Sequence, residues 1–276
     1  MTQTNNSPVI YPDLQHKRVL ITGASSGIGA GMAKNLAAQG CRLVLHYHRN
    51  QAGIDKTLAA VEALGAQAQT LQQDFADSAA LPDFFHQAWQ CFEGLDALVN
   101  NAGVVTKCLS ENDAQGTQFA QTLAINLQAP YVLSTQFAQA CQAANQPGVI
   151  VNNSSIHGQQ TCEWFSAYAA SKAGMDAITK VQAVEWGAAG IRVNGLAPGV
   201  VPVERTERIL NQPAMAQKWT GAMPLGRYGD VSEMGAATAF LLSDTSAWMT
   251  GTQLTMDGGL IARGQYPKRE ATNAQR

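Results

Sequence analysis

Short β-rich runs of apolar residues alternate with helix-length stretches along most of this chain. This order is typical of βαβ units, in which parallel strands form one sheet and helices cover both faces. Because such strands are buried on both faces, they read as almost continuously apolar. The expected strands are 18–22, 42–46, 95–100, 148–153, 191–196 and 253–256, with a weaker run at 66–74. The sequence therefore predicts one α/β domain with a doubly wound parallel sheet of about seven strands.

Length and the polar ends of the chain set the expected boundaries of this domain. A chain of 276 residues can bury one sizeable core, which we place in a domain over 15–262. Residues 1–14 and 263–276 are expected to be polar tails. Prolines interrupt segment 200–226 although it remains partly apolar. We interpret that segment as a mobile lid that contains short helices.

Charge and cysteine content exclude several classes of partner. The formal net charge is −2, so the chain has no basic field that would attract nucleic acid or an anionic membrane. No apolar stretch approaches the roughly 18 residues that a membrane-spanning helix needs. The five cysteines are widely spread and include no Cys-x-x-Cys pair, which favours free thiols in a reducing compartment. We therefore expect a cytoplasmic protein that acts on a small molecule.

A glycine-rich turn, TGASSGIG, follows the first expected strand and opens a helical pattern. Its glycines allow backbone amides to approach a pyrophosphate, whose charge is favoured at the positive end of the following helix. A glycine cluster alone is often just a tight turn, but its place after the first strand favours a dinucleotide site. Its spacing differs from the usual G-x-G-x-x-G. The expected cofactor contacts here are Gly23, Ser25, Ser26, Gly27, Ile28 and Gly29.

Tyr168 and Lys172 stand four residues apart at the start of a helical pattern, so their side chains share one face. A free tyrosine has a pKa of about 10, and a nearby ammonium in a dry pocket can lower it enough for base catalysis. Ser155 follows the expected strand 148–153, at the carboxyl edge where ligands bind in open α/β sheets. Its neighbour Ser154 is expected to face the sheet interior or to cap backbone groups. The pattern predicts proton transfer by the Tyr168 and Lys172 pair, with Ser155 holding the reacting oxygen.

Together these motifs resemble the short-chain dehydrogenase/reductase family, and the resemblance covers residues 15–260. It is carried by TGASSGIG, NNAG at 100–103, Asn126, Ser155 with YAASK, and Pro198-Gly199 after IRVNGLA. It implies a Rossmann-type fold and a catalytic tetrad of Asn126, Ser155, Tyr168 and Lys172. In this family the tyrosine exchanges the proton and the serine positions the substrate oxygen. The lysine lowers the tyrosine pKa and holds the nicotinamide ribose, while the asparagine orders a water relay behind the lysine.

The same resemblance implies further contacts with the dinucleotide. They comprise Tyr168 and Lys172 themselves, Asp74 and Phe75 near the adenine, Asn101, Ala102 and Gly103 along the adenosine ribose, and Pro198, Gly199 and Val201 at the nicotinamide. The family commonly has threonine shortly after that Pro-Gly, where this chain has Val203. A hydrogen bond to the cofactor is therefore either missing or supplied by Thr206.

The end of the second expected strand bears on the choice between NAD and NADP. Enzymes that select NAD carry an acidic side chain there, and Tyr47 occupies that position. Arg49 offers forked donors to a 2′-phosphate, with His48 and Ser25 as lesser contributors. Arg49 could equally be an ordinary loop charge that points to solvent. We predict NADP as the cofactor and keep NAD as the alternative.

Several weaker signals each have an alternative interpretation. His46 and His48 could bind a metal ion, but no third ligand with suitable spacing is visible. No metal site is expected, and a role in lining the adenosine site is favoured. His157 and Trp164 lie in the loop that must pass over the substrate, so they are either substrate contacts or ordinary loop packing. Cys162 has no activating base nearby and is interpreted as a spectator thiol.

The predicted reaction is reversible hydride transfer between NAD(P) and a small alcohol or carbonyl. Polar residues in the substrate loop, and similarity to bacterial glucose 1-dehydrogenase-like members, favour a polyol or sugar. The apolar lid leaves a 3-oxoacyl thioester open, as in 3-oxoacyl reductase-like members, and a catalytically silent dinucleotide-binding sensor or scaffold is the alternative from another class. The resemblance also implies a homotetramer that pairs through the helices containing Asn126 and Tyr168 and through the last strand. Met175, Ile178 and Val181 suit either a core or such an interface.

Overall fold

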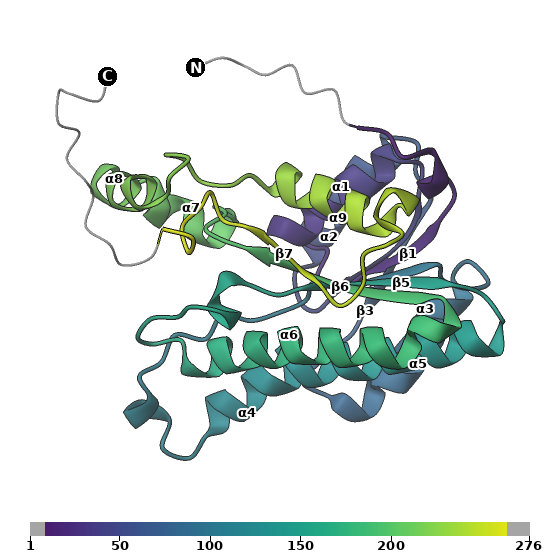
Figure 1. The fold of residues 1–276 in the computed structure, drawn as a ribbon, viewed down its shortest axis with the longest axis horizontal. Coiled ribbons are helices and arrows are strands. Elements are labelled where there is room, and N and C mark those ends of the chain that lie inside the picture. The colour runs from purple at the N-terminus through teal and green to yellow at the C-terminus, as the bar shows by residue number, and fades with distance from the viewer. Residues whose placement is uncertain (1–8, 264–276) are drawn as a thin grey trace.

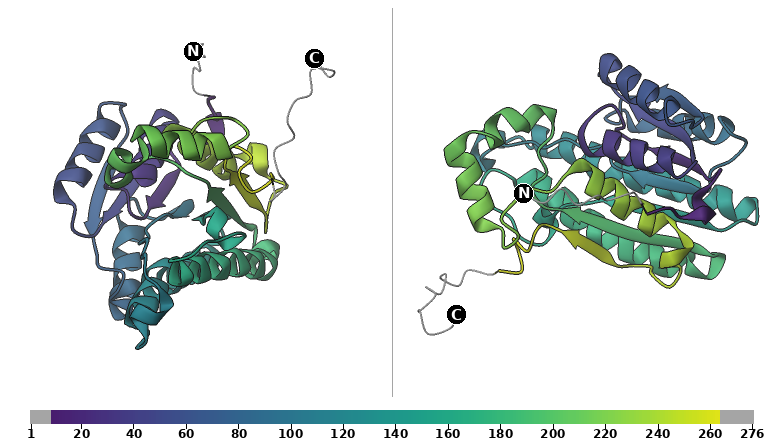
Figure 2. Two further views of the ribbon diagram at one scale, coloured as in Figure 1. Left: turned by 90° about the vertical axis from the view of Figure 1, so that its left-hand side faces the viewer. Right: turned by 90° about the horizontal axis from the view of Figure 1, so that it is seen from above.

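The seven expected apolar runs all become strands of one parallel sheet, which lies between two layers of helices (Figure 1; Figure 2). The computed structural model describes residues 9–263. Its strands are β1 (Arg18–Ile21), β2 (Arg42–Tyr47), β3 (Ala68–Gln72), β4 (Ala97–Asn100), β5 (Gly148–Asn153), β6 (Ile191–Pro198) and β7 (Gln253–Met256). They run in the order β3-β2-β1-β4-β5-β6-β7, with every neighbouring pair parallel. The predicted doubly wound parallel sheet is confirmed.

Strand boundaries differ from the expected ones where tertiary pairing decides them. The weak run at 66–74 shortens to β3, an edge strand whose side chains are only partly buried, which is why it is rich in Thr and Gln. Strand β6 continues past the expected end at residue 196, because Pro198 still pairs with Met256 of β7. The bounds of a buried strand thus match its apolar run, whereas pairing with neighbouring strands sets the bounds of edge strands and the ends of strands.

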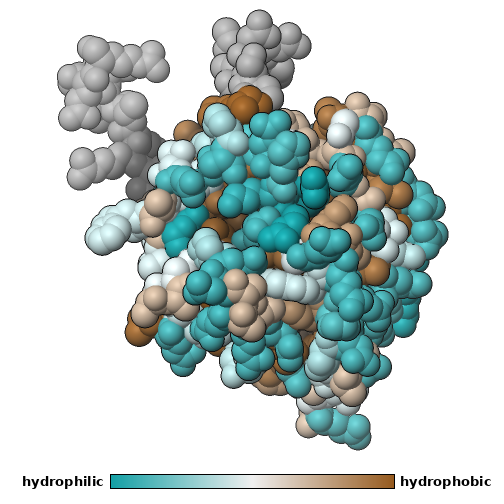
Figure 3. Space-filling model, turned by 90° about the vertical axis from the view of Figure 1, so that its right-hand side faces the viewer, coloured by the Kyte–Doolittle hydropathy of each residue, from teal (hydrophilic) through white to brown (hydrophobic). Residues whose placement is uncertain are grey.

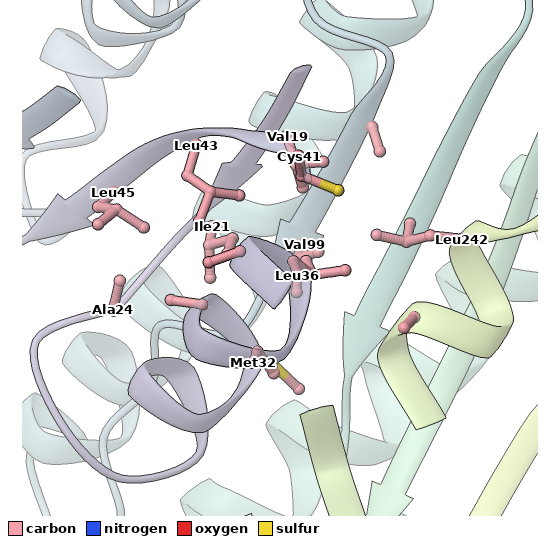
Figure 4. Close-up of a cluster of buried hydrophobic side chains, with 14 of the residues drawn as sticks. Val19, Ile21, Ala24, Met32, Leu36, Cys41, Leu43, Leu45, Val99 and Leu242 are labelled. Carbon is pink, nitrogen blue, oxygen red and sulfur yellow. The ribbon is translucent and has the colours of Figure 1, made fainter. Parts of the chain in front are cut away.

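Each face of the sheet has its own buried core. Helices α1 (Gly27–Ala38), α2 (Gln51–Glu62) and α9 (Val231–Leu242) cover one face, and α3 (Leu81–Gln90), α5 (Ala129–Ala143) and α6 (Ser166–Trp186) cover the other. Val19 and Leu20 are adjacent in β1, so their side chains point to opposite faces. Val19 packs in a cluster with Leu36 of α1 and Leu242 of α9 (Figure 4), while Leu20 packs in the other cluster with Phe137 of α5. Helix α4 (Thr117–Leu123) lies beside α6.

The folded chain begins before the expected boundary at residue 15. Residues Pro12–Leu14 form a short 3-10 turn, and the Leu14 side chain is buried in the same core cluster as Leu36. Of the expected polar tail over 1–14, residues 9–14 are described, and Leu14 among them contributes to the core. Residues 1–8 and 264–276, which include nearly all of the second expected tail, lie outside the described residues.

Segment 200–226 contains two short helices, α7 (Glu204–Leu210) and α8 (Pro213–Ala222). Pro213 lies in the first turn of α8. Backbone amides there have no carbonyl partner within the helix, so the missing N–H of proline costs no hydrogen bond. Both helices lie at the end of the molecule toward which the parallel strands point (Figure 1; Figure 2). The segment therefore stands over the carboxyl edge of the sheet. Within residues 9–263 no helix is both long enough and apolar enough to cross a membrane.

Candidate active site

The carboxyl ends of four strands bring the sequence motifs to one edge of the sheet. The glycine-rich turn follows β1, residues 101–103 follow β4, Ser155 follows β5, and Gly199 follows β6. The strand order reverses between β1 and β4, and ligands in open α/β sheets bind in the crevice at such a point. Parallel pairing thus gathers residues that lie far apart in the sequence.

The glycine-rich turn has a backbone shape that requires glycine. Gly23 has a φ of +68° and Gly27 a φ of +55°, in the left-handed region that side chains disfavour. At position 29 a Cβ atom would overlap the carbonyl oxygen of Gly23. The turn can therefore fold back closely on itself. It leads into the first turn of α1, whose backbone amides have no carbonyl partner within the helix and can donate to a ligand.

Thr22 and Asn101 hold this turn against the loop after β4. The Thr22 Oγ1 accepts hydrogen bonds from the amides of Asn101 and Ala102, both at 2.9 Å. In return the Asn101 side-chain amide donates to the carbonyls of Thr22 at 2.9 Å and Gly23 at 3.1 Å. The Asn101 side chain thus holds the glycine-rich turn in place, and the contact of the backbone at 101–103 with the adenosine ribose stays a prediction. Thr22 was not singled out from the sequence.

His46 also supports the glycine-rich turn, through a hydrogen bond to its backbone. It is buried, and its Nδ1 accepts a hydrogen bond from the Gly23 amide at 3.1 Å, while its Nε2 lies 3.0 Å from the Gln73 carbonyl. Burial lowers the His46 pKa to about 4, so the ring stays neutral and keeps its acceptor. Its ring stacks on Phe75 at a centroid distance of 4.0 Å. His46 thus supports the turn, and the adenosine-site contacts expected of His46 and Phe75 stay predictions.

The end of β2 carries the side chains expected to choose between the dinucleotides. The Tyr47 hydroxyl donates to Gln51 Oε1 at 2.5 Å. The His48 Nε2 lies 3.3 Å from a carboxylate oxygen of Asp74, and Arg49 Nε donates to the same His48 nitrogen at 3.1 Å. Nε2 accepts from Arg49 when it carries no hydrogen and donates to Asp74 when it carries one, so the two contacts exclude each other. Among residues 9–263 no group of three or more His, Cys, Asp or Glu side chains is placed to hold a metal ion.

Ser155, Tyr168 and Lys172 meet at the carboxyl end of β5. The Ser155 Oγ accepts a hydrogen bond from the His157 amide at 3.2 Å and also hydrogen-bonds to Tyr168. Tyr168 and Lys172 share one face of α6, with the Lys172 Nζ 5.8 Å from the Tyr168 ring centroid. Lys172 is buried, and its ammonium donates to the Asn153 carbonyl at 2.7 Å. The side chains predicted to hold and to protonate a substrate oxygen therefore lie together.

Burial dominates the electrostatics of this pair. It raises the pKa of Tyr168, while the Ser155 hydrogen bond and the charge of Arg205 lower it. It also lowers the pKa of Lys172 to about 8, against the charge of Asp176. Arg205 and Asp176 were not singled out from the sequence, because neither belongs to a motif. The effect expected of Lys172 on the Tyr168 pKa stays a prediction.

Asn126 lies in a π-helical turn, Ala124–Gln128, between α4 and α5. Its Oδ1 accepts from the Val104 amide at 2.8 Å, and its side-chain nitrogen donates to the Val104 carbonyl at 2.9 Å and to Ser171 Oγ at 3.1 Å. Both side-chain donors are thus used to tie the loop after β4 to α6, next to Lys172. Such π turns occur frequently at functional sites. The water relay expected behind Lys172 stays a prediction.

The loop after β6 passes close to the end of β7 at Gly199. The Gly199 amide donates to the Met256 carbonyl at 2.9 Å, and a Cβ atom at 199 would lie 2.7 Å from the Asp257 Cα. Val201, two residues further on, is partly buried against the core cluster of α1 and α9. The Thr206 hydroxyl accepts from the Val203 amide at 3.1 Å and lies 3.2 Å from the Val203 carbonyl. It is engaged in starting α7, and a hydrogen bond from Thr206 to the cofactor stays one of the two expected alternatives.

Glu204, the first residue of α7, reaches the glycine-rich turn. Its Oε2 accepts a hydrogen bond from the Gly27 amide at 3.0 Å. That amide belongs to the first residue of α1, where the helix dipole stabilises negative charge. Because this amide donates to a carboxylate, it can also donate to a phosphate oxygen. The turn therefore fits the pyrophosphate of a dinucleotide. Nothing in the local sequence signals this contact between the two segments.

The two expected substrate contacts take different positions. The His157 ring stacks on Phe165 at a centroid distance of 4.6 Å and meets the Tyr168 ring edge-on at 5.6 Å. Burial lowers the pKa of His157. Trp164 has a left-handed φ of +79° and lines a different cavity of about 370 Å³, together with Phe119. His157 thus lies beside Tyr168, whereas Trp164 faces a neighbouring space whose lining includes no tetrad residue.

Known proteins resemble this chain over nearly all of its length. A family model described as Enoyl-(Acyl carrier protein) reductase matches residues 23–261. The 3beta-hydroxysteroid dehydrogenase 1 of Eggerthella lenta is 33% identical, over 91% of this chain and 96% of its own. The galactitol 2-dehydrogenase (L-tagatose-forming) of Cereibacter sphaeroides is 35% identical, over 87% of this chain and 92% of its own. A crystal structure with bound NADP, of an Agrobacterium tumefaciens protein provisionally named 2-deoxy-D-gluconate 3-dehydrogenase, matches with a TM-score of 0.84 and 33% identity, covering 94% of this chain and 100% of that one.

Proposed function

The chain belongs to the short-chain dehydrogenase/reductase family and transfers a hydride between NAD(P) and an alcohol or carbonyl, and we propose that its substrate is a polyol or a sugar. The observation that supports oxidation of an alcohol is the meeting of Ser155, Tyr168 and buried Lys172 at the carboxyl edge of the sheet. An ordered proton donor beside a hydroxyl that can hold the reacting oxygen is what alcohol oxidation requires.

Each residue of the tetrad has a proposed role in moving the proton. Ser155 holds the substrate oxygen, and the Tyr168 hydroxyl removes or returns its proton. Lys172 keeps a positive charge near Tyr168 and holds the nicotinamide ribose, while Asn126 orders the loop beside it. The nicotinamide, when bound, accepts or supplies the hydride. Segment 200–226 acts as a lid that covers the site.

The polyol or sugar substrate is supported by polar groups around Tyr168 and by two relatives. His157 lies against the Tyr168 ring, and the charge of Arg205 reaches its hydroxyl. One relative is named for galactitol and the other for a deoxygluconate. A 3-oxoacyl thioester is the second candidate, favoured by the partly apolar lid.

A substrate panel followed through the absorbance of the reduced nicotinamide tests this function. We expect turnover with polyols or sugar acids that exceeds turnover with 3-oxoacyl thioesters and steroids. A preference for thioesters would overturn the substrate class. Cofactor binding without turnover of any alcohol or carbonyl would instead identify a silent dinucleotide sensor.

We propose that the enzyme prefers NADP. Arg49 and His48 lie together at the end of β2. Tyr47 stands there in place of an acidic residue, whose carboxylate would repel a 2′-phosphate. A charge-assisted contact contributes roughly 1.5–3 kcal/mol, so Arg49→Ala should lower kcat/KM with NADP by about tenfold to a hundredfold and leave NAD unaffected. Arg42→Ala, at the opposite end of the same strand, is the matched control. A tenfold preference of the wild type for NAD, or unchanged NADP kinetics in Arg49→Ala, would show the proposal to be wrong.

Glu204 should compete with the cofactor for the start of α1. A pyrophosphate that reaches the Gly27 amide must displace the carboxylate, which otherwise repels it. Because a charge at a helix terminus contributes roughly 0.3–1 kcal/mol, Glu204→Gln should bind the reduced cofactor about two- to fivefold more tightly. Fluorescence titration measures this dissociation constant, with Glu207→Gln on the same helix as the control. Equal or weaker binding by Glu204→Gln contradicts the prediction.

We propose a homotetramer assembled in part through α4, α5 and α6. These helices expose Phe119, Tyr131, Val181 and Val184, of which Val184 is 84% exposed. Met175 is buried and belongs to the core. By contrast, the end of the molecule opposite the lid carries mainly hydrophilic side chains with scattered hydrophobic ones (Figure 3). Light scattering at micromolar concentration should give the mass of four chains, and a monomer mass would rule the assembly out.

The proposed location is the cytoplasm. Its support is that all five cysteines are free thiols, two of them buried. Free thiols persist in a reducing compartment, whereas oxidising compartments favour disulfides.

A further inference from the structure

Asp176 lies one helical turn beyond Lys172 on α6. Tyr168, Lys172 and Asp176 are spaced by four residues, so all three side chains share one face of the helix. One carboxylate oxygen, Oδ1, accepts a short hydrogen bond from Ser154 Oγ and another from Gln253 Nε2 at 2.9 Å. The carboxylate is therefore held in place by groups from two other elements.

These contacts connect Asp176 to the parts of the site that face the substrate. Ser154 is the residue next to Ser155, and its hydroxyl also lies 3.3 Å from the Lys172 carbonyl. The other carboxylate oxygen packs against Gly158, where a Cβ atom would lie 2.5 Å from it. Gly158 ends the turn Ile156–Gly158, which carries His157. Asp176 thus braces both the end of β5 and the loop beside Tyr168.

The charge of Asp176 acts on Lys172. The buried ammonium donates to one neutral acceptor, the Asn153 carbonyl. Burial lowers the Lys172 pKa, and the Asp176 carboxylate raises it again. The two side chains form no direct ion pair within the part of the chain that the structure describes, so the charge acts through space.

Other groups around the pair do not replace this charge. Burial raises the pKa of Asp176, and the Ser154 hydrogen bond and the charges of Lys172 and Lys180, the last on the next turn of α6, act against that rise. Arg205 of α7 acts on Tyr168. The end of β5 presents neutral Ser154, β7 presents neutral Gln253, and the loop between β5 and α6 presents His157, whose pKa is lowered by burial.

We propose that Asp176 is a positioning residue for the reaction. It anchors the Ser154-Ser155 end of β5 and the turn that carries His157, and its negative charge keeps Lys172 protonated at the working pH. This inference rests on the roles proposed above for Ser155, Tyr168 and Lys172. It adds a residue that binds neither substrate nor cofactor and acts through those that do.

The test is Asp176→Asn, which keeps the size and the Oδ1 acceptor of the side chain but removes its charge. Oxidation should slow as pH rises through the Lys172 pKa of about 8. Without the neighbouring carboxylate this alkaline limb of the kcat profile should move lower by about one pH unit. Asp176→Glu retains the charge and should keep the limb in place. Ser154→Ala removes an anchor but no charge, so it should raise KM with the limb unmoved.

NMR titration of the Lys172 side chain in isotopically lysine-labelled protein supplies a readout that needs no turnover. The resonance, assigned with Lys172→Met, should titrate at lower pH in Asp176→Asn than in the wild type. Glu185→Gln, near the end of the same helix, is the control for a charge removed at a distance. If Lys172 titrates at the same pH in Asp176→Asn and in the wild type, the inference is overturned. Absence of turnover in the wild type would contradict the proposed function alone, because the titration still reports on Asp176.

Discussion

Tyr168→Phe should abolish turnover while the fold and cofactor binding remain. The substitution removes one hydroxyl and keeps the ring, whose neighbours are His157 at 5.6 Å and Phe165 at 6.1 Å between ring centroids. Loss of a positioned proton donor typically costs roughly 10²- to 10⁴-fold in rate. Because the Tyr168 hydroxyl is one of the two groups proposed to contact the substrate oxygen, that oxygen would be left with Ser155 alone.

The measurement is kcat in both directions, with a cofactor titration and a thermal melt on the same protein. Tyr11→Phe, far from the carboxyl edge of the sheet, is the matched control and should retain full activity. Activity of Tyr168→Phe within about tenfold of the wild type would refute the role proposed for the hydroxyl, since general acid–base help is typically larger than that.

Lys172→Met is the second substitution for which we expect a large loss. Methionine fills a similar volume but carries no charge, so the Tyr168 hydroxyl, whose pKa burial already raises, would lose its proton less readily. Residual oxidation should therefore begin at higher pH, with kcat/KM near neutrality lowered by about 10²-fold or more. Cofactor binding should weaken as well, because Lys172 is proposed to hold the ribose.

Stability should change little in the same variant. The Asn153 carbonyl loses its donor, which costs about 1–3 kcal/mol, but the cost of burying an ammonium is removed. The measurements are the pH profile of kcat/KM, the cofactor dissociation constant and the melting temperature, with Lys180→Met on the same helix as the control. A pH profile that coincides with that of the wild type would exclude the role of Lys172 in proton transfer.

The sheet and the central pair of the site could be predicted from the sequence because both depend on short-range patterns. Each buried strand is a continuous apolar run, and Tyr168 and Lys172 share a helix face through their spacing alone. The place of Ser155 followed from topology, since the carboxyl ends of parallel strands lie at one edge. The edge strand β3 was the least certain, because a partly exposed strand needs few apolar residues.

Several parts of the site could not be predicted, because they depend on contacts between distant segments. The hydrogen bond between Gly27 and Glu204 joins residues 177 positions apart, and no motif encodes it. Leu14 reads as part of a polar tail until its side chain is seen in the core. His157 and Trp164 lie in one loop, yet His157 meets the Tyr168 ring whereas Trp164 lines a separate cavity.

The sequence by itself therefore determined the parallel α/β architecture, the dinucleotide turn and the Tyr168 and Lys172 pair. Their signals are local: apolar periodicity, glycine where the backbone is left-handed, and helical spacing. Tertiary structure alone decided that His46 supports the turn, that Glu204 accepts from its Gly27 amide, and that Asp176 accepts from Ser154. The physical reason is that hydrogen bonds and buried charges act over a few ångströms in space, so their partners are known only once the strands and helices are packed together.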